Sequence, residues 1–311
     1  MRAAVLSEFG VPHPGEFEEP TAGDGQAVVD VAMAGLNPVD VVTATGQFYE
    51  GAPRLPSVPG KEGVGTLDGR RVYFSPAVPP FGSMAERALI DPDETFDLPD
   101  GLDDGLAVAL GIAGLAGWLP LSWRARLEPG EHVLVLGASG VVGQVALQGA
   151  RLLGAGRVVA AARSPDGLER ARSLGADAVV SLDQNPDSLP DALAEAAEQR
   201  IDVVVDPVWG EPAVAALKTA SRWARFVQLG QSAGAEAMLA SKYIRGKPLT
   251  IMGHTNFAVP REVRAQAYAE MARHAAAGDL RIDVEEFPLD RVEDAWERQK
   301  ASPNHKLVLV P

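Results

Sequence analysis

The segment HVLVLGASGVVGQVALQGARLLG, residues 132–154, sets the pattern for the larger part of the chain. It opens with an apolar run over 132–137 and continues into the glycine-rich turn GASGVVG, residues 137–143. From residue 141 onward, apolar residues recur at helical spacing. The segment therefore predicts a buried strand, a tight turn and a helix over 141–153.

The same alternation continues downstream. Further apolar runs occur at 157–162, 202–206, 225–230 and 248–253. Segments with helical periodicity follow two of them, at 166–174 and 211–220. Strands that are apolar along their whole length are typical of a parallel sheet covered by helices on both faces. We expect an α/β fold with a doubly wound, Rossmann-type parallel sheet.

The turn matches the dinucleotide pattern G-x-G-x-x-G with alanine in the first position. Gly140 allows the backbone to approach a pyrophosphate, Gly143 allows the helix to pack on the strand, and the helix N-terminus favours phosphate. The alternative is a glycine-rich turn that binds nothing. The candidate cofactor-binding residues of the turn are Ala138, Ser139, Gly140, Val141, Val142 and Gly143.

The end of the next strand indicates which dinucleotide is bound. NAD-binding proteins carry an acidic residue roughly 20 positions after the glycine turn. Here Arg163 and Ser164 stand at that place, and the first acidic residue is Asp166. A guanidinium pairs with a 2′-phosphate and a hydroxyl adds a donor, so NADP(H) is favoured over NAD(H). The alternative for Arg163 is a solvated surface side chain.

The first hundred residues and the C-terminal tail have a different texture. Glycine and proline are frequent at the start, with β-type runs at 26–34, 71–75 and 84–90. This indicates a small, irregular β-rich domain. The tail predicts a helix over 261–277, a β-type segment, a short helix over 292–299 and a last strand over 306–310.

Composition narrows the class of protein. The chain has no cysteine, which excludes disulfides, a thiol nucleophile and zinc sites that need thiolate ligands. A net charge of −14 argues against nucleic-acid binding. The uncharged stretch 105–123 carries several glycines and predicts a buried helix rather than a membrane span. The N-terminus has no apolar signal region, so we expect a cytoplasmic protein.

A second glycine pattern has to be considered. GASGVVG also fits G-x-x-G-x-x-G of the extended short-chain dehydrogenases, and Tyr243 with Lys247 fits their Y-x-x-x-K. In those enzymes the glycine motif stands at the chain start and the two side chains share a helix face. Here 136 residues precede the motif, and Gly246 and Pro248 would interrupt a helix. This interpretation is disfavoured.

Taken together, the segments resemble the medium-chain dehydrogenase/reductases of the zinc-independent quinone oxidoreductase type. The resemblance covers nearly the whole chain. It implies a GroES-like β-rich catalytic domain over 1–112 and 259–311, a Rossmann domain over 113–258, and an active site in the cleft between them. The matching stretches are AGLNPVDVVTATGQF (34–48), LPSVPGKEGVGTL (55–67), LEPGEHVLVLGASGVVGQVALQGARLLGA (127–155), SLGADAVV (173–180), DVVVDPV (202–208), FVQLG (226–230), LTIMG (249–253) and HKLVLVP (305–311).

The resemblance also addresses metal binding. Zinc-dependent relatives carry cysteine, histidine and cysteine at positions matching Asn37, Lys61 and, less surely, Leu110. These residues cannot form the usual zinc set, so no metal is expected. Without a Lewis acid to polarise an alcohol or ketone, an already activated acceptor is implied. The expected reaction is hydride transfer from NADPH to a quinone or an α,β-unsaturated carbonyl.

Three residues are candidates for contact with the acceptor. For Asn37, one interpretation is a hydrogen bond to the substrate or the nicotinamide ribose, and the alternative is a turn residue before Pro38. For Lys61, the functional interpretations are donation to an enolate oxygen or binding of an anionic substrate. The alternative is an ion pair with Glu62 or a nearby carboxylate. Tyr49 lies in a segment that resembles the family's aromatic substrate loop.

Residues after the later strands complete the expected cofactor site, because ligands of doubly wound sheets gather beyond the strand ends. Trp209 lines the cleft or packs in the core, and His254 is a surface or packing residue rather than a base. A tyrosine that often holds the 2′-phosphate in the family aligns with Leu182, which leaves Arg163 as the main indication of NADP(H). The candidates after the fifth and sixth strands are Leu229, Gly230, Gln231, His254 and Thr255.

Two hypotheses remain at this point. The first is an NADPH-dependent reductase of quinones or enones, and the second is an NADPH-binding structural or regulatory protein with little turnover. The resemblance further implies a homodimer formed through the strand around LTIMG, residues 249–253, because an apolar edge strand needs covering.

Overall fold

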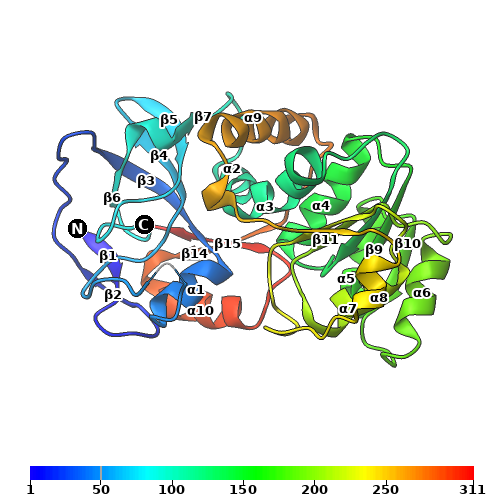
Figure 1. The fold of residues 1–311 in the computed structure, drawn as a ribbon. Helices are drawn as coiled ribbons and strands as arrows, with labels where there is room; N and C mark the ends of the chain where they lie inside the picture. Colours follow the sequence, from blue (N-terminus) through cyan, green and yellow to red (C-terminus); the bar gives the residue numbers. More distant parts are fainter. Residues whose placement is uncertain (50) are drawn as a thin grey trace. The chain divides into compact units, whose positions relative to one another are not determined.

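The computed structural model describes residues 1–49 and 51–311 and divides into two compact units (Figure 1). Unit 1 comprises Met1–Ala113 and Tyr268–Pro311, and unit 2 comprises Gly114–Ala267. The second crossing falls inside one helix, α9 (Arg261–Ala277), rather than in a linker. The structure thus builds unit 1 from both ends of the chain.

Unit 2 contains a six-stranded sheet in which every pairing is parallel, in the order β10-β9-β8-β11-β12-β13. Numbered along the chain, this is 3-2-1-4-5-6, the order of a dinucleotide-binding Rossmann sheet. The strand order reverses between β8 and β11. The strands are β8 (His132–Leu136), β9 (Arg157–Ala162), β10 (Ala178–Ser181), β11 (Val203–Asp206), β12 (Arg225–Gln228) and β13 (Thr250–Gly253).

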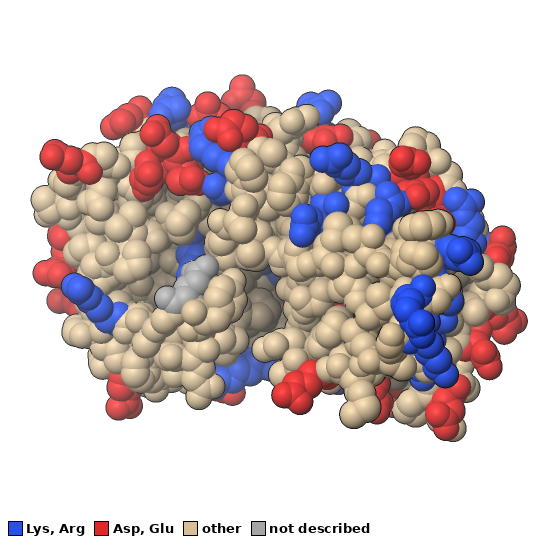
Figure 2. Space-filling view, in the orientation of Figure 1, with Lys and Arg blue, Asp and Glu red and all other residues tan. Residues whose placement is uncertain are grey.

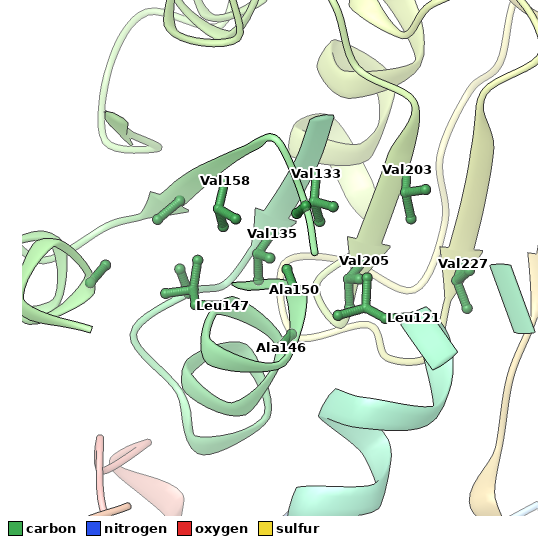
Figure 3. Packing of buried hydrophobic residues seen from close by; sticks show 14 of the residues in the cluster. Leu121, Val133, Val135, Ala146, Leu147, Ala150, Val158, Val203, Val205 and Val227 are labelled. Carbon is green, nitrogen blue, oxygen red and sulfur yellow. The ribbon is translucent and has the colours of Figure 1, made fainter. Parts of the chain in front are cut away.

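Side-chain alternation explains why the central strands of this sheet are mostly apolar. In β8, Val133 and Val135 pack into one core cluster, while Leu134 and Leu136 pack into a second cluster on the opposite face. Figure 3 shows the first cluster, where Leu121 and Leu147 meet the valines of the sheet. Both faces are buried, so neither set of positions is polar. The helices of unit 2 are α3 (Leu115–Leu119), α4 (Val141–Leu152), α5 (Pro165–Ser173), α6 (Leu189–Ala196), α7 (Gly210–Thr219) and α8 (Ser241–Arg245).

Unit 1 is built on a seven-stranded, mainly antiparallel sheet in the order β14-β15-β3-β4-β5-β7, with β6 also paired to β3. The last strand of the chain lies between β14 and β3, so the C-terminus completes a sheet that the N-terminal segment begins. The strands are β3 (Ala27–Leu36), β4 (Gly63–Leu67), β5 (Arg70–Phe74), β6 (Arg87–Ile90), β7 (Thr95–Asp97), β14 (Val284–Pro288) and β15 (Lys306–Val310). A separate hairpin pairs β1 (Arg2–Val5) with β2 (His13–Glu16).

The helices α1 (Pro38–Ala44) and α10 (Val292–Lys300) contribute to the core of unit 1. The short helix α1 follows β3 directly, and α10 packs against it. Trp296 of α10 is 1% exposed and joins the cluster that includes Leu36 and Ala44. These contacts fix α1 beside the end of β3, where the candidate residue Asn37 stands.

The apolar stretch expected as one buried helix over 105–123 is buried but broken. It begins as α2 (Asp104–Ala109), leaves helical geometry at Gly111 (φ −67°, ψ −119°) and resumes as α3. The region Asp104–Ala125 is long and apolar enough to cross a membrane by length and composition alone, and 78% of its most apolar window is buried inside the protein. A side chain at Gly111 would collide with Glu62 and Tyr73, so the kink is fixed by packing.

The strand expected over 84–90 is shorter than predicted. Regular pairing begins only at Arg87, and Ala85 forms an isolated bridge with Ala3. The buried side chains of Met84 and Ala85 gave the sequence its strand-like appearance. The predicted strand was therefore too long, because the apolar pattern includes buried residues that are not paired in the strand.

Candidate functional site

The glycine turn of unit 2 joins β8 to α4, and its glycines differ in the space around them. A Cβ at Gly143 would lie 2.4 Å from the carbonyl oxygen of Gly137 and 2.6 Å from Cα of Ala138. A Cβ at Gly140 would meet only that same oxygen, at 3.7 Å. Gly143 is therefore needed for packing within the chain. The space at Gly140 is open, as expected where a ligand approaches the backbone.

Gly140 also begins α4. Its backbone is extended (φ −74°, ψ 161°), and it has no side chain with which to cap the first N–H groups of the helix. Those groups carry the positive end of the helix dipole. The turn thus offers a positively polarised backbone surface of the kind that binds phosphate.

Neighbouring side chains hold this turn in place. The buried Gln144 donates from Nε2 to the carbonyl oxygen of Ser139 at 2.7 Å and accepts from Nε of Arg170 at 3.1 Å. A Cβ at Gly167 would lie 2.4 Å from Cβ of Ser139, so α5 approaches the turn closely. Contacts from α4 and α5 therefore help to organise the turn.

Arg163 and Ser164 lie directly after β9, the neighbour of β8 in the sheet. Arg163 is exposed. Ser164 begins α5, where its Oγ accepts from the N–H of Gly167 at 3.1 Å and keeps its own proton as a donor. Asp166, the first acidic residue, lies in the first turn of α5. A guanidinium and a hydroxyl, with no preceding carboxylate, therefore stand at the end of β9.

The loops after β11 and β12 pack together at the same edge of the sheet. A Cβ at Gly230 would lie 2.4 Å from the carbonyl oxygen of Pro207, and one at Gly137 would lie 2.7 Å from Cγ1 of Val208. The glycine turn thus adjoins the loop after β11 at the point where the strand order reverses. This is where doubly wound sheets bind their ligands.

Asp206 shapes that second loop. Its Oδ1 accepts from the N–H groups of Val208 at 2.9 Å and Trp209 at 2.8 Å. Burial raises the pKa of Asp206 to about 6, while the two N–H donors oppose the increase. Trp209 has a positive φ of 59° and packs edge-on against Phe226, with the ring centroids 6.3 Å apart. Trp209 is half-buried and packs against the core, and its predicted place at the cofactor site stays a prediction.

The residues after β12 and β13 have mixed environments. Leu229 and Thr255 are half-buried, and Gln231 is exposed. His254 lies 3.1 Å from Oδ1 of Asn256 through Nε2, and its ring meets Trp123 edge-on at 6.3 Å. Burial lowers the pKa of His254, the hydrogen bond with Asn256 opposes the decrease, and Arg124 lowers the pKa further. His254 thus packs within unit 2 as a neutral ring at neutral pH.

One candidate of unit 1, Asn37, lies beside a buried ion pair that the sequence did not reveal. Glu62 and Lys306 are 0% and 2% exposed, and Lys306 Nζ lies 2.6 Å from Glu62 Oε1. Glu62 Oε2 also accepts from the Tyr73 hydroxyl at 2.7 Å and from the Ile112 N–H at 2.6 Å. Such a pair persists in the interior only when further hydrogen bonds satisfy it.

Asn37 is part of this network. Its Oδ1 accepts from Lys306 at 2.6 Å, and its Nδ2 donates to Glu62 at 2.8 Å and to Asp40 at 3.3 Å. The amide is 3% exposed, and both of its N–H groups are engaged. Asn37 therefore fixes the start of α1, and its predicted contact with a substrate or ribose stays a prediction.

Lys61 and Tyr49 lie nearer the surface than Asn37. Lys61 is half-buried, with Nζ 5.2 Å from the centroid of the Phe48 ring. Tyr49 is 73% exposed and packs against Phe48, with the centroids 4.3 Å apart. The structure thus brings the lysine and the two aromatic rings together.

The positions that match zinc ligands do not fit a zinc ion. Asn37 Oδ1 faces the Lys306 ammonium, Lys61 is itself a cation, and Leu110 is fully buried. Over residues 1–49 and 51–311, no group of three or more His, Cys, Asp or Glu is arranged to hold a metal.

A doubly wound unit with an open glycine turn, together with a β-rich unit that holds a buried polar cluster, defines a dinucleotide-binding protein of the dehydrogenase and reductase class. A family model described as zinc-binding dehydrogenase matches residues 141–273. The chain is 30% identical over 318 residues to quinone oxidoreductase-like protein 2 of Rattus norvegicus, covering 95% of this chain and 87% of that protein. It therefore belongs to the medium-chain dehydrogenase/reductases, in their quinone oxidoreductase type.

Two further relatives agree. The quinone oxidoreductase of Pongo abelii is 28% identical over 313 residues, covering 96% of this chain and 93% of that protein. The quinone oxidoreductase from Thermus thermophilus, solved with and without NADPH, is 29% identical, with a TM-score of 0.81 and full coverage of both chains. The family and fold expected from the sequence are thus confirmed.

Proposed function

We propose that the protein is an NADPH-dependent oxidoreductase that transfers a hydride to a quinone or an α,β-unsaturated carbonyl without a metal. The observation that carries this proposal is the open space at Gly140, at the N-terminus of α4 and next to the point of strand reversal. No packing within the chain requires glycine there, whereas a pyrophosphate held against the backbone does.

The phosphorylated form of the cofactor is favoured by Arg163. It is exposed at the end of β9, and Ser164 beside it retains a hydroxyl proton to donate. A guanidinium pairs with a 2′-phosphate through charge-assisted bonds, and no carboxylate at that strand end repels it. The Thermus thermophilus relative, solved in complex with NADPH, supports the same cofactor.

When bound, NADPH supplies the hydride, and the residues of this chain bind and orient the reactants. We assign the pyrophosphate to the turn from Ala138 to Gly143, and the 2′-phosphate to Arg163 and Ser164. The loop residues Leu229, Gly230, Gln231, His254 and Thr255 are proposed to border the nicotinamide.

The acceptor groups are proposed to come from unit 1. Lys61 donates to the oxygen that gains negative charge, and Tyr49 with Phe48 offers aromatic surface for a planar acceptor. Asn37 is assigned a positioning role, because its amide is already bonded to Lys306 and Glu62. The ammonium beside Asn37 supports a reaction without zinc, since two cations at one site repel each other.

The experiment is a spectrophotometric assay of NADPH oxidation with a panel of naphthoquinones and enones. We expect acceptor-dependent oxidation with at least one member of the panel, and slower oxidation with NADH. If every acceptor left NADPH unchanged, the proposal would be wrong. Tight NADPH binding without turnover would favour a structural or regulatory role instead.

We further propose a cytoplasmic homodimer without nucleic-acid or membrane partners. Among the described residues, β13 pairs on one side only, with β12, and three of its four residues are exposed. An edge strand of this kind is a ready site for pairing with a second copy. The net charge of −14 disfavours nucleic acid, and Figure 2 shows acidic and basic side chains interspersed on the visible face.

A further inference from the structure

A small cavity lies inside unit 1, between α1 and the segment 53–61. Its volume is about 90 Å³, several times the roughly 10–15 Å³ that one water molecule needs. Its wall is largely apolar, and the charged side chains that line it are Asp40, Arg54 and Lys61. A cavity of this size accepts the carbonyl end of a small molecule, but not a whole quinone.

Asp40 holds a fixed carboxyl group on this wall. The residue is 2% exposed, and its Oδ2 accepts from the backbone N–H of Asn37 at 2.8 Å and from Asn37 Nδ2 at 3.3 Å. Its Oδ1 is buried and has no hydrogen-bond partner among the described residues. A buried oxygen without a hydrogen-bond partner destabilises the folded state. Its position on a cavity wall therefore points to a ligand that donates a proton or a hydrogen bond to it.

The charges around Asp40 are of both signs. Burial is the largest influence and raises the pKa of Asp40 to about 6, Lys306 on β15 and Lys61 lower it, and Glu62 raises it. Arg54 lies on the same cavity wall. The helix α10, which also packs against α1, contributes apolar residues such as Trp296 to the shared core. The carboxyl therefore changes protonation near neutral pH.

We propose that this cavity is a carbonyl subsite in which Asp40 exchanges a proton with the carbon next to a ketone while Lys61 pairs with the ketone oxygen. A buried carboxyl facing the carbon and a donor facing the oxygen form the minimal arrangement for enolisation. This assignment rests on the proposed function, because an enolate is what hydride addition to an enone leaves behind.

The proton transfer is balanced in both directions. In enolisation, Asp40 carboxylate takes the α-proton, the C–H electron pair forms the C=C bond, and the carbonyl π pair moves to the oxygen beside Lys61. In reduction, the enolate already formed takes the proton back from neutral Asp40 to its α-carbon, and solvent then reprotonates the carboxylate. The first direction needs no redox cofactor, so the chain alone has a further activity: exchange of ketone α-protons with solvent.

The experiment measures α-hydrogen exchange of 2-methylcyclohexanone in D₂O by proton NMR, with the protein and no NADPH. We expect the wild type to accelerate exchange over buffer by at least about 100-fold, within the range that general base catalysis supplies. The rate should rise with pH and level off above about pH 6, because only the carboxylate form of Asp40 takes the proton.

The variants separate chemistry from structure. Asp40→Asn keeps an oxygen that accepts from the Asn37 N–H, so it should fold, and its exchange should fall to the buffer rate. Thr43→Val alters the same wall without removing a carboxyl and should retain the pH dependence of the wild type. Thermal melts of each variant check folding.

Two outcomes overturn the assignment: wild-type exchange equal to buffer, or an Asp40→Asn variant with wild-type exchange. If Asp40→Asn failed to fold, the wild-type pH profile would decide, and a flat profile between pH 5 and 8 would contradict the role of Asp40. NADPH oxidation is measured separately, so exchange without oxidation would contradict the proposed function while supporting the subsite. NADPH oxidation without α-hydrogen exchange would support the proposed function and contradict the subsite.

Discussion

Gly140 and Gly143 belong to one motif, but only one of them is needed by the fold. Substitution Gly140→Ala places a methyl group in open space, with its nearest neighbour at 3.7 Å. Substitution Gly143→Ala places one 2.4 Å from a carbonyl oxygen. The two variants therefore separate cofactor binding from folding.

We expect Gly140→Ala to keep the wild-type melting temperature and to weaken NADPH binding about tenfold or more. Gly143→Ala should lower the free energy of unfolding by about 1–3 kcal/mol, as overpacking does. Thermal melts and NADPH fluorescence titrations measure both effects. Equal loss of stability in the two variants would contradict the distinction.

The sequence predicted the glycine turn at the level of single residues because its spacing is local. It did not predict that Lys306 lies buried against Glu62, because those residues are far apart in the chain and the pairing depends on β15 lying beside β3. Two signals were present: a lysine opening the apolar strand KLVLV, and a glutamate within an otherwise uncharged run after Lys61. The bonds from Asn37 to Lys306 and Glu62 were missed for the same reason.

At the scale of elements, β11 ends in a buried carboxyl that should make stability depend on pH. The pKa of Asp206 is raised from its ordinary 3.8 to about 6 in the folded chain. The folded state therefore binds the proton more tightly, and the contribution of Asp206 to stability is present below about pH 4. That contribution is lost as the pH rises to about 6.

Asp206→Asn should remove this dependence, because the amide does not titrate. The free energy of unfolding of the variant minus that of the wild type should increase by up to about 3 kcal/mol from pH 4 to pH 7. One pKa unit corresponds to about 1.4 kcal/mol, and the pKa of Asp206 is raised from 3.8 to about 6. Denaturant unfolding at several pH values measures the difference. Asp40 is present in both proteins, so its titration affects both equally. A difference in free energy of unfolding that did not change with pH would contradict the prediction.

Elements with long, periodic patterns were predicted closely, and short ones were missed. The helix expected over 141–153 is α4 (Val141–Leu152), whereas α1 has seven residues and no clear pattern. The predicted interruption near Gly246 is confirmed: α8 ends at Arg245, and Lys247 lies outside it, donating to backbone carbonyls of Lys218 and Ala220. Tyr243 and Lys247 therefore do not share one helix face, as the short-chain dehydrogenase motif requires.

At the scale of the whole molecule, the proposed dimer can be tested on the exposed edge strand β13. Light scattering of the wild type should give about twice the chain mass of 32.7 kDa. Ile251→Lys, on the exposed edge, should give the monomer mass. Phe9→Lys is the control, because Phe9 is also an exposed apolar residue but lies in unit 1. A monomeric wild type would contradict the dimer.

The fold class was predictable from the sequence because the central strands of unit 2 are apolar along most of their length, which is typical of a parallel sheet covered on both faces. The physiological acceptor was not predictable, because the side chains proposed to contact it come from separate segments that only the folded chain brings together. The residues proposed to hold the cofactor follow strand ends of one sheet, whereas those of the cavity come from separate parts of unit 1.

The central claim is that a guanidinium at the end of β9 makes this a site for NADPH. Its most direct test is equilibrium titration of NADPH and NADH into the wild type and Arg163→Asp, with Arg172→Gln on α5 as the matched exposed control. We predict tighter binding of NADPH by the wild type and the control, and a loss of that preference of roughly 10- to 100-fold in Arg163→Asp, as one charge-assisted contact supplies. An unchanged preference in Arg163→Asp, or binding of neither cofactor by the wild type, would contradict the account.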